Sequence, residues 1–140
     1  MYKVAVVDDD ELWGLAVQRF FRKEFEVFIF TRAVSLLQKV ELYDLVIIDF
    51  SILPASYEKN MDGKELITHL KQTLPNPPIL VLATGFISKN DTKIGREICP
   101  LADAFFAKDA GLEEILQQTK QLLASKRNKL QLPDQGKQIF

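Results

Sequence analysis

The residues of this sequence best suited to metal and phosphate chemistry stand where short apolar runs end. Three aspartates follow the first run, and an aspartate, a threonine and a lysine follow three later ones: Asp8-Asp9-Asp10, Asp49, Thr84 and Lys108. If these runs are neighbouring strands of one sheet, their ends bring several carboxylates together. Clustered carboxylates repel one another unless a cation joins them, and hard oxygen ligands suit Mg²⁺ or Mn²⁺. The pattern therefore predicts a divalent-cation site.

A phosphoryl group would complete the chemistry of such a cluster. Lys108 and the hydroxyl of Thr84 could bind phosphoryl oxygens, while Asp49 could act as the nucleophile that becomes an acyl phosphate. Each residue alone has an ordinary alternative. Acids at strand ends often cap helices, as Asp10 could, threonine before glycine often forms a turn, and most lysines lie at the surface. The hypothesis of phosphoryl transfer rests on these groups occurring together in this order.

The apolar runs alternate with segments of helical periodicity. We expect strands at residues 2–7, 27–30, 45–48, 79–83 and 104–107. We expect helices near residues 12–20, 34–40, 66–74, 90–98 and 112–123. Strands that alternate with helices form βαβ crossovers, and continuously apolar strands suit a parallel sheet covered on both faces. The sequence thus predicts an α/β fold: a doubly wound (βα)5 sandwich of three layers around a five-stranded parallel sheet.

Length, composition and charge narrow the class of protein. The 140 residues, 47% hydrophobic and 26% charged, are typical of one globular domain. One cysteine excludes an intramolecular disulfide framework, and no apolar run approaches the ~20 residues of a membrane span. Net charge is −5 over residues 1–119 and +4 over residues 120–140. A basic tail can contact nucleic acid, but these cations are few, so we favour a solvated helix end with a loose terminus. We expect a cytoplasmic protein without direct nucleic-acid binding.

Five segments, in order, resemble those of the response-regulator receiver domains of two-component signalling. They correspond to the acidic pair after the first strand, the strand leading to the phosphoacceptor, the Asp-Gly motif, the switch hydroxyl and the lysine after the last strand: Val6–Asp10, Asp44–Asp49, Met61–Leu66, Leu82–Gly85 and Ala102–Lys108. The similarity covers residues 2–124. It implies a flavodoxin-like strand order, 2-1-3-4-5, with a receiver domain at residues 1–124 and a basic, flexible tail at residues 125–140.

The resemblance also implies roles for the acidic residues. Asp49 would be the phosphoacceptor, supplied by a histidine kinase or a histidine phosphotransfer protein. Asp9 would bind Mg²⁺ (or Mn²⁺) directly and Asp8 through water, and the Asp49 carboxylate and the backbone carbonyl of Ser51 would complete the protein ligands. The chain would be a signalling switch rather than an enzyme acting on a small molecule, with at most self-catalysed phosphotransfer and autodephosphorylation.

The remaining implied roles concern the response to phosphorylation. Lys108 would pair with the phosphoryl group, Thr84 would move to bond one of its oxygens, and Phe105 would follow inward. This rearrangement would alter the surface formed by the fourth helix, fifth strand and fifth helix, which would act on a downstream output protein or domain and could also pair two copies of the chain. About sixteen residues follow Ala124, too few for an ordinary DNA-binding output domain. We therefore expect a stand-alone receiver or a piece of a longer protein.

Two departures from the family pattern carry information. Gly63 follows Asp49 by fourteen residues rather than by about eight, and residues 53–60 hold the surplus. This loop could cover the site or bind a partner, although a tolerated surface insertion is at least as well supported. Asp109 stands where the family usually has a cis proline. Since a non-proline cis bond costs about 2.5–4 kcal/mol, we predict a trans bond and a shifted loop, with Asp109 capping the fifth helix or, less favoured, adding negative charge near Lys108.

Three residues that occur once or outside the motifs have simpler interpretations. His69 is the only histidine and is expected at the surface of the third helix. Cys99, beside a proline, is expected to pack as a small apolar group. Trp13 lies four residues after Asp9 and is expected at the edge of the acidic site, where its fluorescence could report Mg²⁺ binding.

Two other functions compete with the receiver interpretation. A pseudo-receiver would be a binding module that no longer uses phosphate, and the long loop and missing proline leave room for it. A haloacid-dehalogenase-like phosphatase would use the Asp-x-Asp that begins at Asp8, with Asp8 as its nucleophile. That class usually has a larger chain and would hydrolyse generic phosphate esters.

Overall fold

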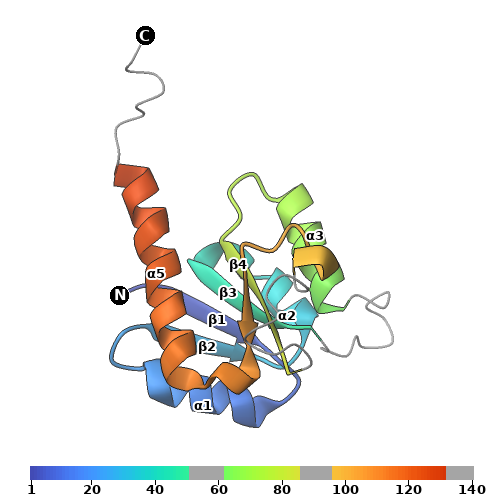
Figure 1. Ribbon diagram of the computed structural model, residues 1–140. Coiled ribbons are helices and arrows are strands. Elements are labelled where there is room, and N and C mark those ends of the chain that lie inside the picture. The colour runs from blue at the N-terminus through green and yellow to red at the C-terminus, as the bar shows by residue number, and fades with distance from the viewer. Residues whose placement is uncertain (51–61, 86–95, 132–140) are drawn as a thin grey trace.

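A five-stranded parallel sheet forms the centre of the molecule (Figure 1). The computed structural model describes residues 1–50, 62–85 and 96–131, of which 127–131 are described as backbone only. The strands lie in the order β2-β1-β3-β4-β5, which confirms the predicted fold class and topology. Their bounds are β1 Lys3–Val7, β2 Glu26–Phe30, β3 Leu45–Asp49, β4 Ile79–Thr84 and β5 Ala104–Ala107.

Helices cover both faces of this sheet, as the continuously apolar strands predict (Figure 1). The helical elements are α1 Glu11–Phe21, α2 Ala33–Leu37, the 3₁₀ turn η1 Val40–Leu42, α3 Gly63–Thr73, the 3₁₀ turn η2 Lys108–Ala110 and α5 Leu112–Gln131. Helices α1 and α5 lie on one face, and α2 and α3 on the other. Of the predicted fourth helix, residues 96–98 are helical and residues 86–95 lie outside the described part of the chain.

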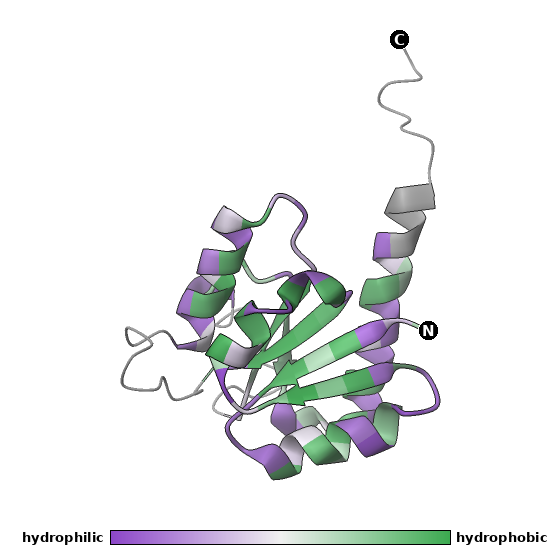
Figure 2. Cartoon of the chain, turned by 180° about the vertical axis from the view of Figure 1, so that it is seen from behind, coloured by the Kyte–Doolittle hydropathy of each residue, from purple (hydrophilic) through white to green (hydrophobic). Residues whose placement is uncertain are grey.

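Alternate residues of each strand enter two separate cores. In β1, Val4 and Val6 face α1 and α5, whereas Ala5 and Val7 face α2 and α3. We call these the α1/α5 core and the α2/α3 core. All four residues are fully buried, because successive side chains of a strand point to opposite faces and each face is covered. Figure 2 shows the result: the strands are predominantly hydrophobic, and the helices carry hydrophilic residues on their outer sides.

Helix bounds differ from the sequence prediction at three places. The segment predicted as one helix over residues 34–40 divides into α2 and η1, since Lys39 leaves the helical region with φ −134°. Helix α3 begins three residues early, because the Asp62 carboxylate caps it by accepting the Glu65 N–H at 2.8 Å. Helix α5 continues to Gln131, past the start of the predicted flexible tail at residue 125. No glycine or proline interrupts residues 125–131, so backbone hydrogen bonding can propagate there.

Two single residues lie where the sequence predicted them. Cys99 is fully buried in the α2/α3 core, and burial raises the pKa of its thiol. His69 is exposed on α3. Among the described helices, none combines the length and apolar character needed to cross a bilayer.

Asp103, whose role was not foreseen from the sequence, links three elements at the amino end of the sheet. Its carboxylate accepts the Leu80 N–H at 2.7 Å and the Lys71 ammonium at 2.8 Å. The first bond lies at the start of β4 and the second comes from α3. This contact therefore joins the segment before β5 to both elements, at the end of the sheet opposite the aspartate cluster.

Gly63 brings the start of α3 against the end of β3. A Cβ atom at this position would lie 2.9 Å from the Cα of Phe50 and would collide with the carbonyl oxygen of Asp49. The Gly63 N–H also donates to the Phe50 carbonyl at 3.4 Å. The Asp-Gly pair thus has a local physical explanation: the aspartate caps the helix and the glycine permits close backbone approach.

We predict that Gly63→Ala lowers the free energy of unfolding by about 1–3 kcal/mol, because the added methyl meets backbone that cannot rotate away. Urea denaturation measures the change. Gly85→Ala is the matched control, since a Cβ there would meet nothing within 4 Å. That variant should stay within about 0.5 kcal/mol of wild type. Equal stabilities for the two variants would contradict the close approach at Gly63.

Candidate functional site

Three carboxylates meet at the carboxyl end of the sheet. Asp8 follows β1 and Asp49 ends β3, and these strands are neighbours with Val7 paired to Ile48. Asp8 is 1% exposed and Asp49 6% exposed, whereas Asp9 is exposed to solvent. Each of the three residues offers a carboxylate oxygen, and these oxygens all lie within 4.8 Å of one another. The strand order therefore produces the acidic cluster that the sequence predicted.

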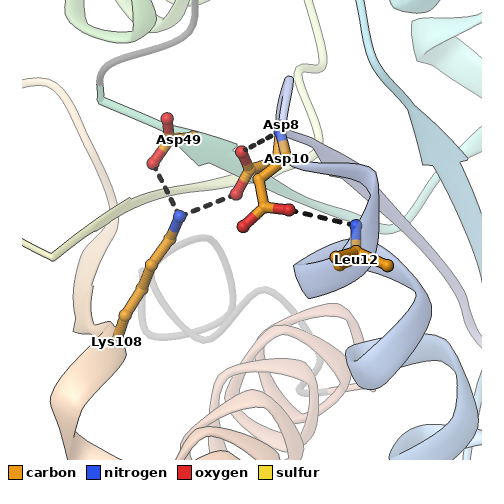
Figure 3. A network of polar contacts seen from close by, with 5 residues as sticks. All are labelled: Asp8, Asp10, Leu12, Asp49 and Lys108. Carbon is orange, nitrogen blue, oxygen red and sulfur yellow. Dashed lines mark hydrogen bonds and ion pairs between the residues drawn. The ribbon is translucent and has the colours of Figure 1, made fainter.

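Lys108 reaches this cluster from the end of β5 (Figure 3). Its ammonium lies 2.7 Å from Asp8 Oδ2 and 3.0 Å from Asp49 Oδ1. Strand β4 lies between β3 and β5, with Ala83 paired to Asp49 and Thr84 paired to Ala107. Thr84 is therefore the last residue of the strand that separates Asp49 from Lys108, and it is buried. The structure thus brings Asp8, Asp9, Asp49, Thr84 and Lys108 to one end of the sheet.

The turn between β1 and α1 orients Asp8. Asp8 Oδ1 accepts the Asp10 N–H at 2.9 Å, so that its other oxygen is left to Lys108 (Figure 3). Asp10 caps α1, as predicted, by accepting the Leu12 N–H at 3.1 Å. The three consecutive aspartates therefore differ in their contacts: Asp8 pairs with the lysine, Asp9 faces solvent and Asp10 starts the helix.

The surroundings of Asp49 disfavour its ionised carboxylate. Burial raises the pKa of Asp49, the hydrogen bond from Lys108 opposes that change, and the charges of Asp8 and Asp9 raise the pKa further. Burial alone would lower the pKa of Lys108, but its hydrogen bonds to Asp8 and Asp49 outweigh that effect and raise the pKa. Lys108 is therefore held as a cation, and one cation does not fully balance the carboxylates.

The unbalanced negative charge of this cluster suits a divalent cation. Three carboxylates and one ammonium leave two formal negative charges if all are ionised. Oxygen donors from Asp8, Asp9 and Asp49 are the type that Mg²⁺ prefers, and few enough to leave positions for water or a substrate oxygen. The predicted fourth ligand, the carbonyl of Ser51, lies outside the described residues, as does the loop at residues 53–60.

The segment after Lys108 departs from one prediction and agrees with another. No described peptide bond is cis, so the predicted trans bond between Lys108 and Asp109 is confirmed. The favoured role of Asp109 as the cap of the last helix is wrong. Asp109 lies inside η2, and Gly111, with φ 89°, is the residue before α5. The 3₁₀ turn places Asp109 three residues ahead of the helix start.

The two aromatic residues that the sequence placed near the site have different surroundings. Phe105, the predicted switch residue, pairs with Leu82 inside the sheet and packs, partly buried, against the α2/α3 core. Trp13 lies beside the site as predicted, but its contact was not foreseen: the Lys108 ammonium lies 4.6 Å from the centroid of its ring. An aromatic residue in the first turn after the acidic run is the only sequence signal for this contact.

We predict that Asp49→Asn stabilises the metal-free protein at neutral pH. The folded-state pKa of Asp49 is raised above 3.8, so the folded state favours the protonated carboxyl, and stability is lost as pH rises through that pKa. The amide avoids this loss. Urea denaturation between about pH 4 and pH 7 should show the stability difference widening as pH rises. A variant less stable than wild type at pH 7 would contradict the raised pKa.

Comparison with known proteins supports the assignment of the fold. No protein-family model and no curated protein matches the sequence. Among solved structures, the beryllofluoride-activated receiver domain of DrrB is 26% identical, with a TM-score of 0.69 over 89% of this chain and 98% of that one. A CheY-like receiver domain protein from Methanospirillum hungatei is 21% identical, with a TM-score of 0.73 over 92% and 98%.

A third similar structure is the receiver domain of the Francisella response regulator 1452. It is 19% identical, with a TM-score of 0.72 over 90% of this chain and 99% of that one. Each of these three receiver domains is covered almost completely, and the shared strand order is the one described above. The chain therefore has the fold of response-regulator receiver domains.

Proposed function

We propose that the chain is a phosphoacceptor switch, in which Asp49 receives a phosphoryl group in a reaction that requires Mg²⁺. The observation that carries the proposal is the position of Lys108, whose ammonium contacts Asp49 at 3.0 Å and Asp8 at 2.7 Å. A nucleophilic carboxylate, further carboxylates and an adjacent cation are the groups that phosphoryl transfer needs. Asp49 lies at the carboxyl end of its strand, where doubly wound sheets bind their ligands.

The proposed donor is a phosphohistidine of a histidine kinase or of a histidine phosphotransfer protein. An Asp49 carboxylate oxygen attacks phosphorus and forms the new P–O bond. The P–N bond to the donor imidazole breaks, and the leaving nitrogen keeps the electron pair. Lys108 is close enough to Asp49 to balance negative charge on the transferred group.

Asp8, Asp9 and Asp49 would hold the metal ion, together with the Ser51 carbonyl. When bound, Mg²⁺ supplies positive charge to the phosphoryl oxygens. The chain's own residues fix the arrangement: Asp8 is oriented by the Asp10 N–H, and Asp49 by the sheet. Asp9, exposed to solvent, is the carboxylate most accessible to an incoming ion.

The output surface is proposed from the position of Phe105. An open hollow of about 720 Å³ lies between the segment at residues 96–106 and α5, and Phe105 contributes to its lining with Arg96 and Gln121. We propose that Thr84 moves toward the phosphoryl group and that Phe105 follows, which would change the shape of this hollow. A downstream output protein or domain, or a second copy of the chain, would read the change in the cytoplasm.

Of the two alternative functions, the structure disfavours the phosphatase more than the pseudo-receiver. The phosphatase requires Asp8 as a nucleophile, but both Asp8 oxygens are engaged, one by the Asp10 N–H and one by Lys108, and Asp8 is only 1% exposed. The pseudo-receiver remains the second candidate, because Asp109 replaces the usual proline and because the loop between Asp49 and Gly63 is long. Phosphorylation itself separates the two.

We predict that incubation with Mg²⁺ and acetyl phosphate adds one acid-stable, base-labile phosphoryl group to the wild type, measured by intact-protein mass. Asp49→Asn should gain none. Lys108→Met should react more slowly because the positive charge is lost. Methionine is chosen because its side chain is similar in length to that of lysine. Asp44→Asn is the matched control: it makes the same chemical change at the opposite end of β3, where Asp44 accepts the Lys3 N–H, and it should react as the wild type does.

The same preparation tests the alternatives. No added mass on the wild type would favour the pseudo-receiver. Hydrolysis of a generic phosphate ester such as p-nitrophenyl phosphate, abolished by Asp8→Asn and retained by Asp49→Asn, would favour the phosphatase.

We also predict that Mg²⁺ alone stabilises the folded protein. A ligand at a hundred times its dissociation constant adds about 2.7 kcal/mol to the free energy of unfolding. A titration followed by melting temperature and by the fluorescence of Trp13, the only tryptophan, should saturate with one constant. Asp9→Asn should weaken the apparent affinity because it removes one ligand charge. A titration that never saturates would argue against a specific metal-binding site.

A further inference from the structure

Lys108 makes three contacts, and the carboxylates account for only two of them. Its ammonium lies against Asp8 and Asp49 and also 4.6 Å from the centre of the Trp13 ring. A lysine ammonium is a compact charge on a flexible four-carbon stem, so two carboxylates attract it without fixing its direction. The side chain is still 21% exposed, which leaves it a path toward solvent.

Trp13 is held in place independently of Lys108. It is in the first turn of α1, which Asp10 caps, and its own N–H donates to the Asp10 carbonyl at 3.2 Å. The side chain is partly buried and packs against the α1/α5 core. The position of the indole is therefore set by α1 and the α1/α5 core and not by the lysine.

We propose that Trp13 is a positioning residue, whose indole face holds the Lys108 ammonium at the acidic cluster and keeps it from turning to solvent. This inference deepens the proposed function and rests on it for its consequence, the rate of phosphoryl transfer. The contact suits that purpose because an aromatic ring attracts a cation that lies over its face within about 6 Å of the ring centre.

The expected effect is moderate. A cation over an aromatic ring contributes an amount equivalent to about two- to thirtyfold in a rate or an equilibrium. Because indole binds cations better than a phenyl ring does, and an aliphatic side chain does not bind them, the order expected is Trp13, then Trp13→Phe, then Trp13→Leu. A purely apolar packing role would instead make phenylalanine and leucine equivalent.

The first experiment measures the geometry without phosphate or metal. In the wild type, NMR should show the Hε protons of Lys108 shifted upfield by the ring current of the indole above them. Trp13→Phe should keep part of this shift, and Trp13→Leu should abolish it. Leu12→Ala is the matched control, because Leu12 is the preceding residue of α1 and is 77% exposed. Absence of the upfield shift in the wild type would overturn the proposal.

The second experiment measures the consequence with acetyl phosphate and Mg²⁺. Trp13→Leu should be phosphorylated about two- to thirtyfold more slowly than the wild type, and Trp13→Phe should recover part of the rate. Melting temperatures establish that each variant is folded. Equal rates in all three would overturn the positioning role. If the wild type is not phosphorylated at all, the proposed function fails, and the ring-current shift alone decides whether Trp13 holds Lys108.

Discussion

The ammonium of Lys108 pairs with two carboxylates, those of Asp8 and Asp49, which the fold buries. Asp8 and Asp49 end neighbouring strands, and burying both would be costly without the contacts of 2.7 Å and 3.0 Å from Lys108. The strand order makes these contacts possible: β3 adjoins β1, and β4 alone lies between β3 and β5. The remaining negative charge is what the proposed divalent cation would balance.

The scaffold fixes the site through its backbone. Each strand contributes side chains to both cores, so its end cannot shift without disturbing two cores. At the opposite end of the sheet, Asp103 ties the segment before β5 to Leu80 and Lys71. Beside the site, Gly63 packs on the backbone at Phe50. The side chains with chemistry therefore project from positions that are determined by packing rather than by their own interactions.

The sequence predicted the strands and the acidic cluster well because both depend on local patterns. Apolar runs bounded by polar residues define the strands, and parallel strands necessarily bring their carboxyl ends together. The predictions from the sequence were wrong where competing local structures differ little in free energy. The end of α5, the break at Lys39 and the 3₁₀ turn containing Asp109 are of this kind. The contact between Trp13 and Lys108 joins residues far apart in the chain, and no periodicity encodes it.

The close approach of Gly63 to Phe50 has a consequence for the connection between β3 and α3. The Gly63 nitrogen and the Phe50 carbonyl oxygen are 3.4 Å apart, so the described ends of the connection between β3 and α3 lie next to each other. Each doubling of a loop's length costs only about 0.6 kcal/mol when its ends stay fixed. The length of this connection can therefore change at a small cost in the free energy of unfolding. The same junction is a natural place to graft a recognition module onto the domain.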